Sequence, residues 1–461
     1  MNAWWTGLSL VDGWVPTVVD VAASVLVAGA VILVIRGRRG APIRRGRRAL
    51  TIVTSAIAGG AVGFALCWLL SDQLNLFDVS LTPISRAWVV AAFAATATAI
   101  AAIVLGRWRA RLIASVAIVA SLMAGAAGVN ADFGQYTTVG SLSDHQVAPP
   151  LSASLLAQQE QRAPGAMQSV HAVPGSAGTS RPTHSLALWR TAHVPTPSRG
   201  VVGSIVIPAT VSHFAARTAY VYLPPAALLP HPVALPVIVM LSGQPGSPGN
   251  VIASGGIAAI FDAFARAHHG LAPIVVAPDQ LSAPQLNPMC VDGSLGASAS
   301  YLTVDVPNWI RTHLTVQTDN AEWAIGGFSQ GGTCAIQLGS QRPDLYSGII
   351  DVSGQLAPKN GGLLQTIARG FDGDAAEYRA ALPVTVLAAK APYTDSVAVF
   401  GVGQLDARYG PVSLKVSAAA ERAGIHTTRV VSPGTGHDWH TVKWVLTKEL
   451  TPILRHMGLE P

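Results

Sequence analysis

Four long apolar stretches lie before residue 130, and the rest of the chain alternates short apolar runs with amphipathic segments. The apolar stretches cover approximately residues 14–35, 50–70, 87–106 and 112–129. Each is close to the roughly 20 residues that a helix needs to cross a bilayer, and none contains Lys, Arg or Glu. The pattern predicts a four-helix transmembrane domain over residues 1–130. Small residues are dense at 58–63 and 123–128, where they would allow helices to approach closely.

The later part of the chain has a different pattern. Residues 131–197 are rich in Ala, Pro, Ser and Gly and lack periodicity, which predicts an extracytoplasmic linker with a short helix within 151–170. From residue 198 to 461, strand-like runs alternate with helical segments. This alternation predicts a mostly parallel sheet covered by helices on both faces. The expected strands lie within 204–211, 218–226, 236–241, 272–279, 321–327, 347–354, 397–403 and 427–433.

Charge is scarce and unevenly distributed. Only 12% of the 461 residues are charged, and the formal net charge is +6. Residues 1–130 carry eleven Arg and four Asp, which gives +7, and the remainder carries −1. The basic charge therefore belongs to the membrane domain, and nothing indicates a nucleic-acid partner.

The arginines predict the orientation in the membrane. Seven Arg lie in the first loop (36–48) and three in the third (107–111), whereas the second loop (71–85) has two Asp and no basic residue. Cytoplasmic loops carry the positive charge, so both termini are expected outside the cytoplasm. The chain is thus predicted to be an integral plasma-membrane protein with residues 198–461 outside the cytoplasm.

Residues 327–331 read Gly-Phe-Ser-Gln-Gly, between a predicted strand and a predicted helix. This is the context of a nucleophile elbow, in which small residues allow the tight turn that exposes the serine. The interpretation as a plain Gly-rich turn is weaker, because acid and histidine candidates follow in the expected order. Ser329 is therefore the predicted nucleophile.

The acid and the base are expected after later strands. Asp406 follows the run 397–403, although it could also cap the next helix; Asp351 and Asp395 are the fallback candidates. His437 follows two glycines in a loop after the last strand, and His440 is its competitor.

Acyl transfer also needs hydrogen-bond donors for the developing oxyanion. The backbone N–H of Gln330, directly after the nucleophile, is one expected donor, and the Gly243–Gln244 step in the loop 241–250 is the other. The histidines show no metal-ligand spacing, and no metal or organic cofactor is implied.

Two of the three cysteines, Cys290 and Cys334, lie in the C-terminal part of the chain. Cys334 comes five residues after Ser329, and Cys290 lies in the loop after the strand within 272–279. In a parallel sheet of the usual order that strand would neighbour the one leading to Ser329. Outside the cytoplasm such a pair persists as a disulfide, so a Cys290–Cys334 bridge is expected.

Several segments in sequence order resemble the esterase family of α/β hydrolases that includes antigen 85-type mycolyltransferases, feruloyl esterases and S-formylglutathione hydrolase. They are VYLPP, LSGQPG, WAIGGFSQGGTCA with RPDLYSGIIDVSGQ, and GTGHDWHTV. The resemblance covers residues 200–461, and membrane-anchored actinobacterial members look similar from residue 1. It implies an α/β-hydrolase fold with Ser329, Asp406 and His437 as the triad and Gln330 with Gln244 at the oxyanion hole.

The chain departs from the mycolyltransferases at two places. Its oxyanion loop reads Ser242-Gly243-Gln244-Pro245 instead of an Asp-Gly-Leu-Arg-like stretch, and its triad acid would be Asp instead of Glu.

The sequence predicts a membrane-anchored serine esterase or acyltransferase that forms an acyl-enzyme on lipid or cell-envelope esters. The alternative is a catalytically degenerate hydrolase domain that binds envelope glycans or lipids.

Reporter fusions test the predicted orientation. An alkaline phosphatase fused after Pro461 should be active, because this enzyme folds only outside the cytoplasm, and one inserted in the loop 36–48 should be inactive. A cytoplasmic reporter should give the reverse pattern. Activity of the phosphatase at 36–48 and not after Pro461 would contradict the orientation and, with it, an extracytoplasmic substrate.

Overall fold

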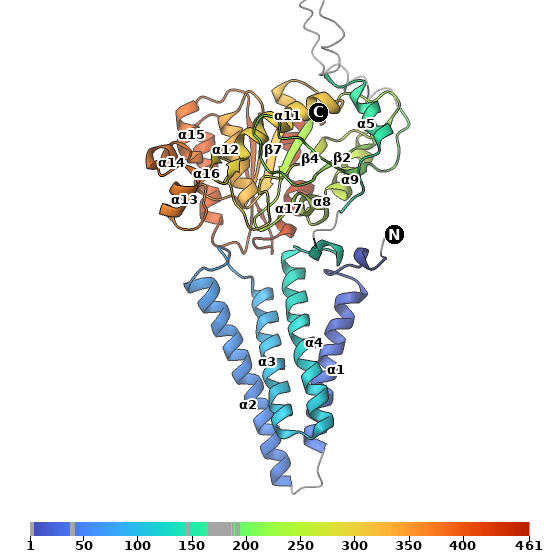
Figure 1. Cartoon of the computed structure of the whole chain (residues 1–461), viewed down its shortest axis with the longest axis vertical. Coiled ribbons are helices and arrows are strands. Elements are labelled where there is room, and N and C mark those ends of the chain that lie inside the picture. Colours follow the sequence, from blue (N-terminus) through green and yellow to red (C-terminus); the bar gives the residue numbers. More distant parts are fainter. Residues whose placement is uncertain are drawn as a thin grey trace, which may run out of the picture. The chain divides into compact units, whose positions relative to one another are not determined.

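The computed structural model describes residues 4–36, 42–143, 147–164, 186, 189 and 194–460 (Figure 1). The chain divides by its contacts into two compact units. The first comprises residues 1–145 together with Thr435–Trp439, and the second comprises Gln146–Gly434 and His440–Pro461. Part of the first loop (37–41) and much of the predicted linker (165–185, 187–188 and 190–193) lie outside the described residues.

In the first unit, the described residues contain four helices that are long and apolar enough to cross a membrane. The second continues beyond Cys67 as a π-helical turn, Trp68–Gln73. The helices are α1 (Trp14–Arg36), α2 (Pro42–Cys67), α3 (Pro83–Leu105) and α4 (Trp108–Phe133).

Local signals set the ends of these helices. Thr82 caps α3, because its side chain accepts a hydrogen bond from the Ser85 N–H at 3.1 Å and Pro83 occupies the first turn. Gly134 ends α4 in the left-handed conformation, with φ of 64°.

The expected close helix packing is confirmed. A Cβ at Gly59 would lie 2.5 Å from that of Ala97 on α3, and a Cβ at Gly125 would lie 2.6 Å from that of Ala92. Only glycine fits at such approaches, so α3 packs tightly against both α2 and α4.

In the second unit, the described residues form an eight-stranded sheet of order β1-β2-β4-β3-β7-β8-β9-β10. β2 pairs antiparallel with β1 and with β4, and the other pairs are parallel. All eight strands lie at or near the predicted runs. They are β1 (Val201–Ile205), β2 (Ala219–Leu223), β3 (Val237–Leu241), β4 (Ile274–Ala277), β7 (Trp323–Phe328), β8 (Gly348–Val352), β9 (Val397–Gly403) and β10 (His426–Ser432). A separate ribbon pairs β5 (Asp292–Gly293) with β6 (Gly296–Ala297).

Helices lie on both faces of the sheet, as predicted. One core cluster joins Ile349 and Phe400 of the sheet to Ile336 of α12 (Gln330–Gln341), Leu387 of α15 (Pro383–Lys390) and Val416 of α16 (Gly410–Arg422). The other face of the sheet packs against α17 (Trp439–Lys448) and α18 (Thr451–His456). A Cβ at Gly401 would contact Val445 of α17, and a Cβ at Gly348 would contact Ile453 of α18. The α/β-hydrolase fold is thus confirmed. The helices are α5 (Ala153–Glu160), α8 (Pro248–Ala253), α9 (Ile257–Ala267), α10 (Ser298–Ser300), α11 (Val306–His313), α12 (Gln330–Gln341), α13 (Leu363–Gly370), α14 (Ala375–Ala380), α15 (Pro383–Lys390), α16 (Gly410–Arg422), α17 (Trp439–Lys448) and α18 (Thr451–His456).

Part of the predicted linker packs within the second unit. The fully buried Gln159 of α5 donates to the Ala227 carbonyl at 2.7 Å, and its own side-chain oxygen accepts from the Thr315 N–H at 3.2 Å. Leu151 and Ser204 also share a backbone hydrogen bond, Leu151 N to Ser204 O, at 3.0 Å. Residues 147–164 are therefore held by the hydrolase fold.

Candidate active site

The turn between β7 and α12 holds Ser329 in a strained conformation. Its φ is 55° and its ψ is −114°, a region that non-glycine residues occupy rarely and usually at functional sites. The Ser329 N–H donates to the Val352 carbonyl at 2.8 Å, which fixes the turn to the end of β8. The strand before this serine and the helix after it are as predicted.

Two glycines make this turn possible. A Cβ at Gly327 would overlap the backbone of Gly331, and a Cβ at Gly331 would lie 2.5 Å from the carbonyl oxygen of Ser242. The turn therefore has no space for side chains at either position. Ser329 is left at the N-terminus of the twelve-residue helix α12, where the backbone dipoles favour negative charge.

The loop 241–250, which follows β3, lies against this turn. A Cβ at Gly243 would be 3.5 Å from the Cβ of Ser329 and 3.2 Å from the ring of Phe328. The Gly243–Gln244 step is thus beside the serine, where a second oxyanion donor is expected. The side chain of Gln244 points to another loop, because its Nε2 donates to the Gln285 carbonyl at 3.0 Å.

Asp406 lies three residues beyond β9, at the edge of the sheet where the parallel strands end, and is 2% exposed. Its Oδ2 accepts from the Ser353 hydroxyl at 2.9 Å, and its Oδ1 accepts from the Tyr409 N–H at 3.2 Å. The second contact stabilises the turn before α16, whose N-cap residue is Tyr409 and not Asp406. Ser353, directly after β8, is a partner of Asp406 that the sequence analysis missed, although its place at the carboxyl end of a strand could have indicated it.

The two fallback carboxylates lie elsewhere. Asp351 is within β8, buried beneath α12, and its Oδ1 accepts from the Gly354 N–H at 2.8 Å. Burial raises the pKa of the Asp351 carboxyl to about 7. Asp395 is exposed and precedes β9, at the edge of the sheet opposite the carboxyl ends.

The two candidate histidines differ in burial. His437 is 6% exposed and lies five residues beyond β10, whereas His440 is exposed on α17. Gln404 connects the loops after β9 and β10, because its N–H donates to the Ser432 carbonyl and its Oε1 accepts from the Gly434 N–H, both at 2.9 Å. His437 itself lies in the segment Thr435–Trp439, which belongs to the first unit.

The Cys290–Cys334 disulfide is confirmed, with a Cα–Cα distance of 5.6 Å. The strand order used to predict it is wrong. β4 does not neighbour β7, because β3 lies between them. Cys290 still reaches Cys334 because it lies thirteen positions beyond the end of β4, far enough for this segment to pass the end of β3.

Among the described residues, no group of three or more His, Cys, Asp or Glu side chains could hold a metal ion. The turn at Ser329 contacts the Val352 carbonyl and Gly243, and the next residue after Val352, Ser353, donates to the Asp406 carboxylate.

The fold and this site define an α/β hydrolase. Residues 215–456 match the Putative esterase family, and the chain belongs to that family. A relative of similar length, described as an uncharacterized protein of Corynebacterium glutamicum, is 28% identical over 467 residues, with 100% of both chains covered.

Similar solved structures cover the hydrolase part. A ferulic acid esterase is 16% identical (TM-score 0.47; 57% of this chain and 100% of that chain). The S-formylglutathione hydrolase of Agrobacterium tumefaciens is 19% identical (TM-score 0.46; 57% and 98%). MPT51 of Mycobacterium tuberculosis is 16% identical (TM-score 0.41; 57% and 99%).

Removing the disulfide should destabilise the protein. The chain-entropy model assigns about 4 kcal/mol to a bridge that closes a loop of this length. The double variant Cys290→Ala, Cys334→Ala should therefore melt well below the wild type in detergent, as followed by tryptophan fluorescence. The matched control is Cys67→Ala, which removes the buried free cysteine of α2. Equal melting temperatures for the double variant and the wild type would contradict this expectation.

Asp351 should make stability depend on pH. Its folded pKa of about 7 lies above its usual value of 3.8, so between these values the folded state binds a proton that the unfolded state lacks. The stabilisation is complete below about pH 4 and is lost as the pH rises through about 7. The melting temperature of Asp351→Asn relative to the wild type should therefore rise between about pH 4 and pH 7. A difference that stays constant with pH would show that folding does not raise the pKa of Asp351, and Asp395→Asn is the exposed control.

Proposed function

We propose that the protein is a membrane-anchored serine esterase or acyltransferase that acts outside the cytoplasm. The observation that carries this proposal is the strained Ser329 at the start of α12, with the loop 241–250 against it. Asp406 and His437 complete the proposed triad. Both follow parallel strands of the same sheet, so their loops leave from the edge at which Ser329 lies.

The proposed reaction is a double displacement. His437 takes the proton of the Ser329 hydroxyl as Oγ attacks the acyl carbonyl, and Asp406 orients the imidazole and stabilises its charged form. The N–H groups of Gln330 and Gln244 stabilise the negative oxygen of the tetrahedral intermediate. The C–O bond to the leaving alcohol then breaks, and His437 supplies the alcohol with its proton.

The second displacement releases the acyl group. Water or a sugar hydroxyl attacks the acyl-enzyme while His437 accepts its proton, and the Ser329 oxygen leaves as the hydroxyl re-forms. Water as acceptor makes the protein an esterase, and a sugar hydroxyl makes it an acyltransferase. The four apolar helices support a lipid or cell-envelope ester as substrate, because they would keep the enzyme at the membrane surface.

Substitution of the triad tests this proposal. Ser329→Ala, His437→Ala and Asp406→Asn should each reduce kcat for a short-chain aryl ester, by roughly 10⁴–10⁶ for a triad member. Ser329→Ala should also lose labelling by a fluorophosphonate probe. The measurements use the full chain in detergent, with circular dichroism to verify that each variant is folded.

His440→Ala and Asp395→Asn are the matched controls, and both should keep near-wild-type kcat. A Ser329→Ala variant with more than a few per cent of the activity would overturn the proposal. An inactive His440→Ala beside a mildly affected His437→Ala would reassign the base. A wild type that neither turns over esters nor reacts with the probe would favour a binding domain.

A further inference from the structure

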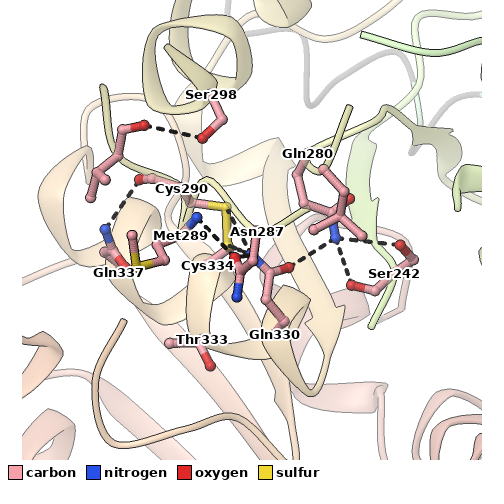
Figure 2. Close-up of a disulfide and its surroundings, with 12 residues drawn as sticks. Ser242, Gln280, Asn287, Met289, Cys290, Ser298, Gln330, Thr333, Cys334 and Gln337 are labelled. Atoms are coloured by element: carbon pink, nitrogen blue, oxygen red, sulfur yellow. Dashed lines mark hydrogen bonds between the residues drawn. A yellow bond between two sulfur atoms is a disulfide. The ribbon is translucent and has the colours of Figure 1, made fainter. Parts of the chain in front are cut away.

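A connected group of buried amide side chains lies behind Ser329. It consists of Gln280, Gln330 and Asn287, which are at most 4% exposed. Figure 2 shows Gln330 at its centre, with Gln280 and Ser242 on one side and Asn287 with the disulfide on the other. Gln280 and Asn287 lie in the segment after β4, and Gln330 begins α12, so the group joins that segment to the nucleophile turn.

Gln280 bridges the two segments that would supply the oxyanion donors. Its Nε2 donates to the carbonyl oxygen of Ser242 at 2.6 Å and to Oε1 of Gln330 at 3.1 Å. Ser242 directly follows β3 and is the second residue of the loop 241–250. Gln330 directly follows the nucleophile. Since β3 lies between β4 and β7, Gln280 reaches from the end of β4 across the end of β3.

The contact with Ser242 fixes more than one atom. The C=O and N–H of a planar trans peptide point in opposite directions. Holding the Ser242 carbonyl oxygen therefore also sets the direction of the Gly243 N–H, at the residue that precedes Gln244. Arg217 adds a second restraint, because its Nη2 donates to the Gly246 carbonyl at 3.0 Å and to Oδ1 of the buried Asp279, next to Gln280, at 2.8 Å.

The side chain of Gln330 is held at its other end as well. Its Nε2 donates to Oδ1 of Asn287 at 3.0 Å and lies 3.2 Å from the sulfur of Cys334. Asn287 is itself fixed, since its Nδ2 donates to the Lys359 carbonyl at 2.9 Å. With both ends of its amide bonded, the side chain of Gln330 has little freedom to rotate, which restrains the first residue of α12 directly after Ser329.

We propose that Gln280 is a positioning residue for the oxyanion hole, holding the loop 241–250 and Gln330 in the relative placement that a tetrahedral intermediate requires. The inference rests on the proposed function of Ser329. Oxyanion donors are effective because they are already oriented before the reaction, and a displacement of about 1 Å can cost roughly 10²-fold in rate. One amide bonded to both segments keeps that displacement small.

The first test is Gln280→Met, which keeps the length of the side chain and removes both donor contacts. We expect kcat for an aryl ester to fall about 10–10²-fold with KM within about twofold, because the oxyanion exists only after the substrate is attacked. The affinity for an aryl boronic acid, which forms a tetrahedral adduct on serine, should fall by the same factor as kcat/KM.

Gln337→Met is the matched control. Gln337 is also fully buried, its Nε2 donates to the Cys290 carbonyl at 3.1 Å, and its Oε1, like that of Gln280, has no hydrogen-bond partner among the described residues. The two substitutions should lower the melting temperature to a similar extent, but only Gln280→Met should lower kcat. An equal loss of kcat in both variants, or a change in KM alone, would overturn the proposal.

Gln280→Glu gives a second readout that does not depend on the fold tolerating methionine. In this variant a protonated carboxyl can donate one hydrogen bond as the amide does, whereas an ionised carboxylate would repel the oxygens of Ser242 and Gln330. The kcat of Gln280→Glu relative to wild type at the same pH should rise as the pH falls. A ratio independent of pH would contradict the proposal.

Ser329→Ala in the same assay separates the outcomes. If it stays active, the proposed function fails. If it is inactive while Gln280→Met and Gln280→Glu behave like wild type, only the positioning role fails.

Discussion

The tight turn at Ser329 is the constraint on which the rest of the hydrolase unit depends. A Cβ at Gly327 would overlap the backbone of Gly331, and a Cβ at Gly331 would overlap the carbonyl oxygen of Ser242, so neither position has space for a side chain. The strands on either side of β7 therefore both take part in the turn, β3 through Ser242 and β8 through the bond from Ser329 N to Val352 O. A positive φ at a serine costs of order 1–3 kcal/mol, and it persists only where neighbours restrict the backbone in this way.

The sequence indicated the elements around this turn better than their order in space. The runs 236–241, 272–279 and 321–327 are almost wholly apolar because strands in the centre of a covered parallel sheet are buried on both faces, and each contains a strand. Apolar runs do not say which strand pairs with which. β3 lies between β4 and β7. The disulfide was therefore predicted correctly although β4 and β7, which the prediction took as neighbours, are not adjacent.

Polar partners were the least predictable part of the site. Ser353 and Asp406 are separated by 53 residues and Gln280 and Gln330 by 50, and contacts at such separations leave no periodic signal in a sequence. The contacts of the segment 147–164 are equally long in range, since Gln159 bonds to Ala227 and Thr315 and Leu151 to Ser204. Motif spacing can indicate a nucleophile, whereas the groups that orient it become visible only in three dimensions.

Three unfavourable features are concentrated around one serine. Ser329 has a strained backbone, Asp351 is a buried carboxyl beneath its helix, and Oε1 of Gln280 has no hydrogen-bond partner among the described residues. An unpaired buried polar group costs roughly 1–3 kcal/mol, so apolar residues at such positions would give a more stable protein. The disulfide offsets part of this cost, since it joins the segment after Asn287 to the nucleophile helix. Local rules are broken together mainly at functional sites, which supports a site built around Ser329 over a sheet optimised for stability alone.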